Sequence, residues 1–326
     1  MDNAKYFPAV EDIQSASGVL EEILEPTPLQ KNPNLSDLYD AQVYLKREDL
    51  QMVRSYKIRG AYNKIRSIAP ATLKYGIVCA SAGNHAQGVA FSCNKLHIMG
   101  SIYMPVTTPR QKIEQVRMFG KEYIDIVLVG DTFDAANAAA IEYAKKSGKT
   151  FIPPFDDQRI IEGQGTIGYE ILSQVKQAPD YVFIPIGGGG LASGVGAYIK
   201  TLSPKTKVIG VEPAGAPCMK VAIEKGEVIE LDHINKFVDG AAVKKAGKLT
   251  YEICKDVLDD IVTVPEGAVC TSIINLYNKS AIVVEPAGAL AVAALKFYKD
   301  EIKGKRVACV VSGSNNDITR MEEIRE

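Results

Sequence analysis

Residues 181–195 have the sequence YVFIPIGGGGLASGV, in which a run of apolar residues leads into four consecutive glycines and then into a helix-forming segment. The apolar run at 181–184 predicts a buried strand. Gly187 to Gly190 place no side chains between backbone N–H groups and a ligand, and the following helix adds about half a positive charge at its N-terminus. Because four glycines are costly in chain entropy for a plain turn, the stretch predicts a phosphate-binding loop between a strand and a helix.

The same alternation of apolar runs and amphipathic stretches extends over most of the chain. We expect one helix to begin at Thr108-Pro109, with Thr108 as its cap, and to end at Gly120, and a second helix over residues 133–147 to stop at Gly148. Strand–helix alternation indicates an α/β fold with parallel sheets and helices on both faces. The predicted strands are residues 43–46, 76–80, 101–104, 126–129, 181–184, 208–211 and 306–311.

The composition indicates a globular protein that binds a small molecule. The chain has 326 residues, 46% of them hydrophobic, and its 38 basic and 39 acidic residues give a net charge of −1, which argues against nucleic-acid binding. No apolar run approaches the ~20 residues that cross a bilayer, and no signal peptide is visible, so we expect a cytoplasmic protein without a membrane partner. Six cysteines without C-x-x-C spacing and three histidines without zinc spacing predict buried thiols and no metal site.

The identity of the phosphate compound stays open at this point. Gly187, Gly189 and Ala192 fit the loose dinucleotide fingerprint, and Glu212 lies where a ribose-binding acid would be expected, so a nicotinamide (NAD) dependent oxidoreductase is a real alternative. A Walker-type nucleotide site is excluded, because no Gly-Lys-Ser/Thr follows the glycines.

Two further segments are candidates for binding or catalysis. Ser55-Tyr56-Lys57-Ile58-Arg59-Gly60 contains a lysine that, taken alone, would be assigned to the solvated surface. Residues 81–88, SAGNHAQG, follow a predicted strand and open a helix, so their backbone N–H groups can bind an anion such as a carboxylate. An ordinary helix cap explains the second segment equally well.

Together these motifs resemble a known family. The sequence resembles the fold-type II pyridoxal 5′-phosphate (PLP) enzymes, and within them the threonine dehydratases of the biosynthetic type. The resemblance covers nearly the whole chain and rests on seven motifs in order: the Lys57 hexapeptide and residues 81–88, 160–168, 187–190, 238–240, 284–288 and 312–316. It implies two doubly wound α/β domains with the cofactor between them, a small domain of residues 52–152 and a large domain of residues 1–51 and 153–326.

The resemblance implies the roles of individual residues. Lys57 would bind PLP as a Schiff base and, once released, act as general base. The cofactor would be bound further by Tyr56 beside the ring, Asn84 at the 3′-hydroxyl, Gly187, Gly188, Gly189, Gly190 and Leu191 at the phosphate, Ser312 at the pyridine nitrogen, and Gly240 and Glu285 near the ring. The substrate carboxylate would be bound by Ser81, Ala82, Gly83 and His85.

The implied reaction is the β-elimination of water from L-threonine, which yields 2-oxobutanoate and ammonia in isoleucine biosynthesis, with L-serine to pyruvate as a secondary activity. A serine dehydratase, or another β-eliminating enzyme of the same fold type, stays open as an alternative. The family also implies a homodimer or a homotetramer.

Three departures from the family pattern carry expectations of their own. Ala82 stands where serine racemase, a relative, has a serine that acts as a second acid or base, so we expect little racemisation. Cys218, six residues after Glu212, replaces an aspartate of that relative's divalent metal site, so no divalent metal should be required. The chain ends at Glu326, where a regulatory domain would begin, so no isoleucine inhibition through such a domain is expected.

Overall fold

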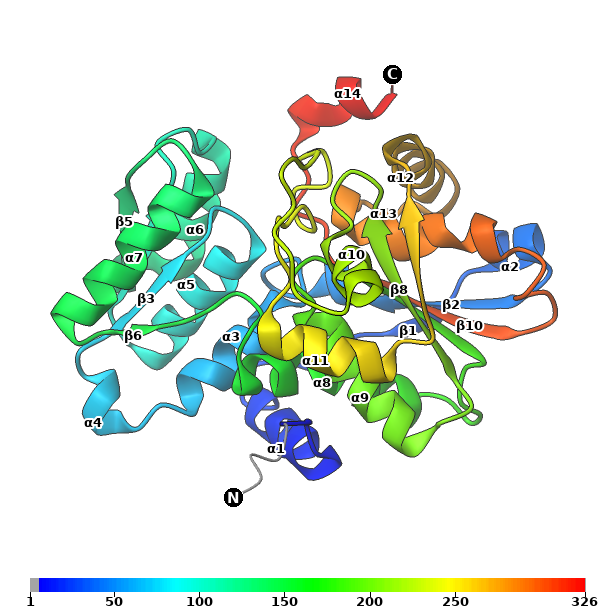
Figure 1. Cartoon of the computed structure of the whole chain (residues 1–326), viewed down its shortest axis with the longest axis horizontal. Helices are drawn as coiled ribbons and strands as arrows, with labels where there is room; N and C mark the ends of the chain where they lie inside the picture. Colours follow the sequence, from blue (N-terminus) through cyan, green and yellow to red (C-terminus); the bar gives the residue numbers. More distant parts are fainter. Residues whose placement is uncertain (1–5, 326) are drawn as a thin grey trace.

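The protein contains two β-sheets, each covered by helices, which form a small and a large unit side by side (Figure 1). The structure is a computed structural model that describes residues 6–325. Among the described strands, β1 and β2 pair antiparallel and all other pairs are parallel, which confirms the predicted α/β fold. In spatial order the larger sheet consists of β1 (Leu29–Lys31), β2 (Gln42–Arg47), β10 (Arg306–Val311), β7 (Tyr181–Pro185), β8 (Lys207–Pro213) and β9 (Asp260–Val264), and the smaller of β5 (Ile124–Leu128), β4 (Gly100–Met104), β3 (Ile77–Ala80) and β6 (Thr150–Phe151).

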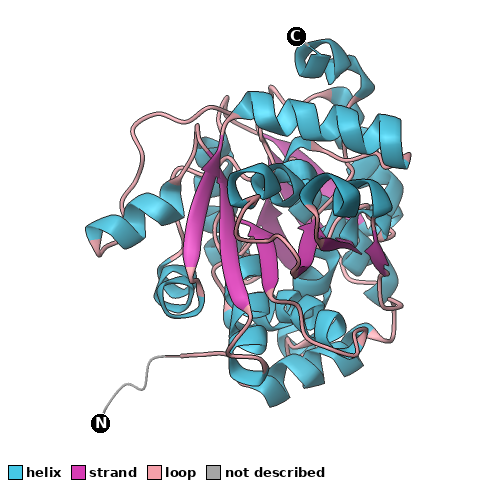
Figure 2. Cartoon of the chain, turned by 90° about the vertical axis from the view of Figure 1, so that its right-hand side faces the viewer, coloured by secondary structure: helices cyan, strands magenta, loops and turns pink. Residues whose placement is uncertain are grey.

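Helices bury the large sheet on both faces. Because successive side chains of a strand point to opposite sides, a strand such as β7 contributes to two apolar clusters. In β7, Val182 and Ile184 belong to one apolar cluster and Phe183 to another. The first cluster is completed by α8 (Gln158–Ser173), α9 (Gly190–Leu202), α10 (Cys218–Lys225) and α11 (Lys248–Val257), and the second by α2 (Pro33–Tyr39), α12 (Glu266–Ser280) and α13 (Pro286–Ala294). Figure 2 shows these strands enclosed between helices.

The small sheet is covered in the same way by fewer helices. Ile77 and Cys79 of β3 pack into a cluster with α3 (Lys57–Arg66), α5 (Asn84–Leu96) and α6 (Arg110–Gly120), whereas Val78 and Ala80 face α7 (Phe133–Ser147). The remaining helices are α1 (Val10–Leu20), α4 (Pro70–Leu73), α14 (Met321–Arg325) and the 3-10 turns η1 (Glu48–Leu50), η2 (Lys121–Tyr123), η3 (Leu295–Tyr298) and η4 (Ile318–Arg320).

The two helices predicted with caps differ in outcome. Helix α7 spans the predicted residues 133–147 and ends at Gly148, whose φ of 72° is left-handed. Helix α6 ends at Gly120 as predicted, but the predicted cap is wrong: Pro109 takes the N-cap position, and the hydroxyl of Thr108 is buried without a hydrogen-bond partner. Pro109 has an extended ψ of 137°, so the helix begins one residue later than the sequence suggested.

The strands of the two sheets come from different parts of the chain. All strands of the four-stranded sheet lie within residues 52–152, and all strands of the six-stranded sheet lie outside them. The domain boundaries themselves remain our proposal. Within residues 6–325, no helix combines the length and the apolar character needed to span a membrane.

Candidate functional site

Lys57 is the first residue of α3, and its amine contacts the segment that follows the last strand of the small sheet. Nζ donates a hydrogen bond of 2.7 Å to the backbone carbonyl of Pro154 and lies 5.4 Å from the centre of the Tyr56 ring. The surrounding protein lowers the pKa of Lys57 to about 8, mainly by desolvation, and the negative charge of Glu285 offsets only part of this effect. A substantial fraction of the amine is therefore neutral near pH 8, and a neutral amine can act as a nucleophile or a base.

The segment that crosses from the small to the large unit joins the lysine to the glycine loop. Nζ of Lys57 contacts Pro154, and the next residue, Phe155, packs against the loop: a Cβ atom on Gly190 would lie 3.0 Å from Phe155, and one on Gly188 would overlap its ring. Nε2 of His85 lies 3.0 Å from the carbonyl oxygen of Ile152 in the same segment. Lys57 and the glycine loop, which are more than 120 residues apart in the sequence, therefore contact the adjacent residues Pro154 and Phe155.

The glycine loop directs its carbonyl groups into the protein. The carbonyl oxygens of Gly187, Gly188 and Gly189 accept hydrogen bonds from the Cys218 thiol, the Thr250 hydroxyl and a backbone N–H of α9, respectively. Gly189 has a φ of 97°, which requires glycine, and no side chain caps the first turn of α9. With the carbonyls engaged and the helix start uncapped, the N–H groups of the loop suit an anion, and phosphate binding by this loop stays a prediction.

A hydrogen-bonded group of Asn84, Glu285 and Asn315 links the start of α5 to the large unit. Nδ2 of Asn84 donates to Oε1 of Glu285 at 2.7 Å, and Oδ1 of Asn84 accepts from Nδ2 of Asn315 at 2.7 Å. Burial, followed by the charge of Asp239, raises the pKa of Glu285 to about 7. A Cβ atom on Gly240 would lie 3.3 Å from Oε1 of the same carboxyl group, so the predicted Gly240 also adjoins this network.

Ser312 lies directly after β10 and beside the lysine segment. Its carbonyl oxygen accepts a hydrogen bond of 3.1 Å from the backbone N–H of Tyr56, and Ser55 pairs with Gly313 in an isolated bridge. The Ser312 hydroxyl is buried and donates to the carbonyl of Ala287 at 3.2 Å. Three predicted cofactor residues, Tyr56, Lys57 and Ser312, are thus brought together by backbone contacts.

Ser81, Ala82 and Gly83 form the turn between β3 and α5 and are partly accessible. Oγ of Ser81 accepts a hydrogen bond from the N–H of Gly83, and α5 begins at Asn84 without a side-chain cap. The next residue, His85, is close enough to Lys57 for the two charges to interact, and burial followed by this interaction lowers the pKa of His85 to about 3. The turn therefore adjoins the lysine, but its contact with a substrate stays a prediction.

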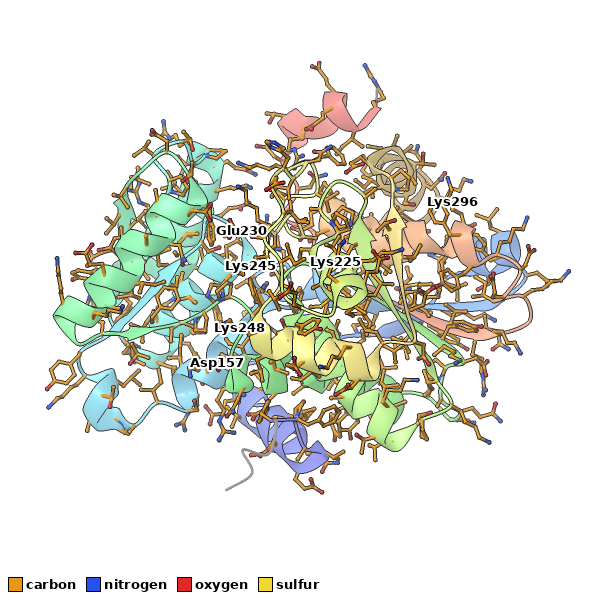
Figure 3. The ribbon with its side chains drawn as sticks, viewed as in Figure 1. Asp157, Lys225, Glu230, Lys245, Lys248 and Lys296 are labelled. Atoms are coloured by element: carbon orange, nitrogen blue, oxygen red, sulfur yellow. The ribbon has the colours of Figure 1, made fainter. Side chains whose placement is uncertain are left out.

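Three further residues organise the site, and none of them was expected from the sequence to bind or react. Pro154 accepts the lysine hydrogen bond, Asn315 bridges Asn84 and the backbone of Val53, and Asp156 accepts hydrogen bonds from three N–H groups at the start of α11. Figure 3 shows Lys248, the first residue of α11, and Asp157 at this junction. Pro154 and Asp156 lie just after the expected domain boundary at residue 152, and Asn315 lies in the motif of residues 312–316, in which only Ser312 was expected to bind the cofactor.

Glu212 does not have the environment that a ribose-binding acid requires. Its carboxylate is fully buried and accepts hydrogen bonds of 2.8 and 2.9 Å from the N–H groups of Met219 and Lys220 at the start of α10. This geometry disfavours the oxidoreductase alternative. Among residues 6–325, no three His, Cys, Asp or Glu side chains gather as metal ligands would. That no divalent metal is required remains a prediction.

Comparisons with known proteins identify the family of the chain. The profile of the pyridoxal-phosphate dependent enzyme family matches residues 20–313. The chain is 61% identical to the biosynthetic L-threonine dehydratase IlvA of Halalkalibacterium halodurans and 56% identical to that of Bacillus subtilis, and both alignments cover 97% of this chain, with 76% and 75% of the relatives. The structure of the processed form of threonine deaminase isoform 2 from Solanum lycopersicum superimposes with a TM-score of 0.92 at 39% identity, covering 97% of this chain and 91% of that one.

The family match spans most of the chain, and the matched region contains every candidate residue from Tyr56 to Ser312. The relatives share more than half of their aligned residues with the chain over most of their own length. The chain therefore belongs to the pyridoxal-phosphate dependent enzymes, and within them to the threonine dehydratase family.

Proposed function

We propose that the protein is a PLP-dependent lyase that deaminates L-threonine to 2-oxobutanoate and ammonia, with L-serine to pyruvate as a secondary reaction. The observation that carries the proposal is the environment of Lys57, a desolvated amine whose pKa of about 8 suits covalent and acid–base chemistry. The names of the relatives support threonine as the substrate. A serine dehydratase, or another β-eliminating enzyme of the fold, is the second candidate.

The residues present fit PLP. The Lys57 amine would bind the cofactor's aldehyde, and the uncapped glycine loop of residues 187–191 would bind its phosphate by backbone N–H groups. We assign the 3′-hydroxyl to Asn84, whose amide already joins Glu285 and Asn315, and place Gly240, Glu285 and Tyr56 around the ring. Ser312 would serve the pyridine nitrogen, which requires its hydroxyl hydrogen to turn away from Ala287.

The chemistry divides between cofactor and protein. Bound PLP withdraws electrons from the substrate Cα atom, so that its proton can be removed. In the proposed reaction the neutral amine of Lys57 takes that proton. Because the pKa of Lys57 is about 8 rather than its ordinary value near 10.5, far more of the amine is neutral at the pH of a cell.

The start of α5 is our proposed binding site for the substrate carboxylate. The N–H groups of Ser81 and Gly83 already donate, to the carbonyl of Tyr103 and to Oγ of Ser81, so the N–H of Ala82 and the uncapped start of α5 are the groups of this turn that favour an anion. Since Nε2 of His85 faces a carbonyl oxygen, it carries the hydrogen, and the neutral ring then has only an acceptor at Nδ1. We therefore expect backbone amides rather than the His85 ring to bind the carboxylate.

The cellular setting and the assembly also belong to the proposal. We infer a cytoplasmic enzyme that acts in isoleucine biosynthesis. The names of the relatives, biosynthetic L-threonine dehydratases, support the biosynthetic role. We further infer a homodimer or a homotetramer. Light scattering after size-exclusion chromatography measures the assembly, and a monomer at micromolar concentration would contradict this inference.

A ketoacid assay that compares L-threonine with L-serine tests the function. We expect an absorbance band of bound PLP, formation of 2-oxobutanoate from threonine, and a lower kcat/KM for serine. A higher kcat/KM for serine would favour the serine dehydratase alternative. A protein that binds no PLP would contradict both candidates.

A further inference from the structure

The motif at residues 160–168 has no role in the site described so far, yet it packs directly against the helix that begins with Lys57. Gly163 of α8 lies so close to α3 that a Cβ atom on it would come within 2.7 Å of both the carbonyl oxygen of Arg59 and the Cα atom of Gly60. Gln164 accepts a hydrogen bond of 3.2 Å from the N–H of Gly60. The two helices are therefore in backbone contact, and α8 supports the first turn of α3.

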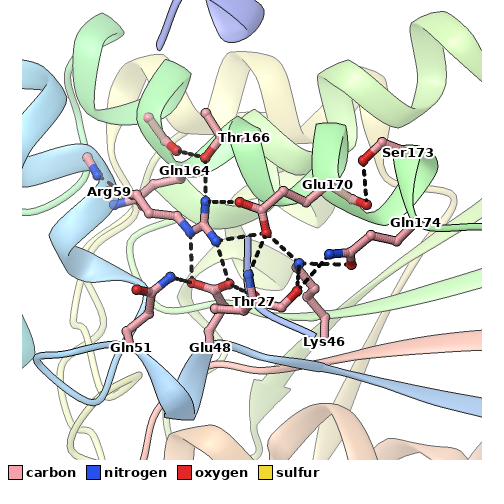
Figure 4. Close-up of polar contacts among 12 residues, drawn as sticks. Thr27, Lys46, Glu48, Gln51, Arg59, Gln164, Thr166, Glu170, Ser173 and Gln174 are labelled. Carbon is pink, nitrogen blue, oxygen red and sulfur yellow. Dashed lines mark hydrogen bonds and ion pairs between the residues drawn. The ribbon is translucent and has the colours of Figure 1, made fainter. Parts of the chain in front are cut away.

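Arg59, two residues after Lys57, uses all of its hydrogen-bond donors in contacts with Glu48 and with two residues of α8 (Figure 4). Nε and Nη2 donate to the two oxygens of Glu48, each at 2.8 Å. Nη1 and Nη2 donate to the two oxygens of Glu170 at 2.6 and 3.0 Å, and Nη1 also donates to the Thr166 hydroxyl at 3.0 Å. A guanidinium has five N–H groups, so none is left unpaired.

Lys46 completes the cluster from the large sheet. Its three ammonium donors reach Glu170 at 2.5 Å, the carbonyl of Thr27 at 2.6 Å and Gln174 at 3.2 Å. Lys46 and Arg59 balance Glu48 and Glu170, and all four side chains are almost completely buried. A shift of α3 would separate buried charges from their partners, so the cluster resists such a shift strongly.

We propose that Arg59 is a positioning residue: the buried ion network of Lys46, Glu48, Arg59 and Glu170 fixes α3 and thereby places the Lys57 amine where the cofactor's aldehyde must bind. The proposal rests on the proposed role of Lys57. Arg59 lies only about 3 Å along the helix axis from Lys57, so whatever fixes one fixes the backbone of the other. The pKa of Lys57 is set by burial and by Glu285, so the network acts through position rather than through charge.

The test separates the position of the amine from the integrity of the pocket. Cofactor-free protein is mixed with PLP, and the rate of covalent capture by Lys57 is followed by absorbance and by the induced circular dichroism of the bound ring. In parallel, the affinity for pyridoxine 5′-phosphate, which has the phosphate and the ring but no aldehyde, is measured. Wild type must capture PLP and Lys57→Ala must not; failure here would overturn the role of Lys57, and the inference built on it.

Arg59→Lys keeps the positive charge but loses the planar guanidinium with its five N–H donors. We expect the capture of PLP to slow by about tenfold or more, because a small displacement of a reacting group lowers its reaction rate strongly. The induced circular dichroism should change, whereas the affinity for pyridoxine 5′-phosphate should stay within about threefold of wild type. Ile273→Ala, a cavity variant in the distant α12, is the control for destabilisation and should change neither. An unchanged capture rate, or a parallel loss of capture and affinity, would overturn the proposal.

A second pair of variants decides the matter if Arg59→Lys does not fold. Glu170→Gln leaves a buried excess of positive charge, and we expect slower capture. Adding Lys46→Met removes that excess, while the amide introduced at position 170 keeps an oxygen for Arg59, so the capture rate should return to within about threefold of wild type. If Glu170→Gln captures PLP at the wild-type rate, or if the double variant is no faster than the single one, the network does not position the lysine.

Discussion

Arg59 and Lys57 are two residues apart, Arg59 buried and Lys57 partly buried, and the surrounding protein shifts their pKa values in opposite directions. Burial alone would lower the pKa of Arg59, yet Glu48 and Glu170 raise it above its ordinary value. Burial lowers the pKa of Lys57 to about 8, and Glu285 offsets this only in part. The difference lies in the partners: two carboxylates contact Arg59, whereas the amine of Lys57 contacts a neutral carbonyl.

This contrast separates groups that keep their charge from groups that change it. Glu48, paired with Arg59, has a lowered pKa in spite of its burial, whereas burial raises the pKa of Glu285 to about 7. Ionisable groups with pKa values near neutrality can exchange protons during a reaction, and they gather at functional sites. The paired region thus supplies rigidity, and the adjacent unpaired region supplies reactivity.

Removal of the unpaired amine should have the largest effect. Lys57→Ala should lower the rate of 2-oxobutanoate formation by about 10⁴-fold, because both the covalent attachment of PLP and the general base are lost. The assay is run with PLP in excess, so that weak binding does not limit the rate. Unfolding by urea should show a stability equal to or above that of wild type, since a buried amine that favours neutrality is removed. A residual rate above about one-hundredth of wild type would contradict the role of Lys57.

Removal of one charge from the paired region should reduce stability instead. Glu170→Ala removes the carboxylate that pairs with Lys46 and one of the two that pair with Arg59, so a buried positive charge is left unbalanced, and we expect the free energy of unfolding to fall by about 3–5 kcal/mol. Denaturant unfolding of the cofactor-free protein measures this fall. Glu142→Ala, which breaks the exposed pair with Lys146 on α7, is the matched control and should cause no measurable loss. Equal losses in the two variants would show that the buried network does not stabilise the fold.

The sequence predicted those features whose cause is local. The glycine loop and helix α7 follow from neighbouring residues, and both are where the sequence placed them. Strands β1, β6 and β9 were not predicted: β1 and β6 have only three and two residues, too short for a periodic signal, whereas β9 has five residues and was missed. Lys57 was identified from motifs, but its pKa depends on Glu285, which is more than 220 residues away in the chain. The Arg59 network could not be predicted either, because Glu170 is 111 residues from Arg59 and no local pattern encodes that contact.

The raised pKa of Glu285 predicts a pH dependence of stability in the cofactor-free protein. From pH 4.5 to about 7 the unfolded state loses this proton while the folded state keeps it, so wild type loses stability as the pH rises. Glu285→Gln cannot lose a proton. Its stability relative to wild type should therefore rise over this range, by on the order of 3 kcal/mol, and stay constant above it.

Urea unfolding at half-unit steps between pH 4.5 and 8 measures this difference. Glu142→Gln, at an exposed carboxylate, provides the control and should show a nearly constant difference from wild type. A flat profile for Glu285→Gln would show that the folded protein does not hold the proton, and that Glu285 belongs with the permanently charged groups.

We expect the smallest effect on activity from the loss of an exposed ion pair between Lys112 of the small unit and Asp239 of the large unit. Nζ of Lys112, on α6, lies 2.6 Å from the carboxylate of Asp239, next to Gly240, and the two side chains are 28% and 39% exposed. Such pairs contribute about 0.2–1 kcal/mol and weaken in salt. Lys112→Ala should therefore raise KM for L-threonine by up to about fivefold at low ionic strength, and much less at 1 M salt, with kcat nearly unchanged.

Arg110→Ala is the matched control for Lys112→Ala, because Arg110 pairs with Glu114 within α6 and not across the two units. It should leave KM unchanged at every salt concentration. If Lys112→Ala instead lowers kcat and leaves KM unaffected, the contact acts on a step after binding. The exposed pair would then belong with the reactive region rather than with the contacts that only hold the two units together.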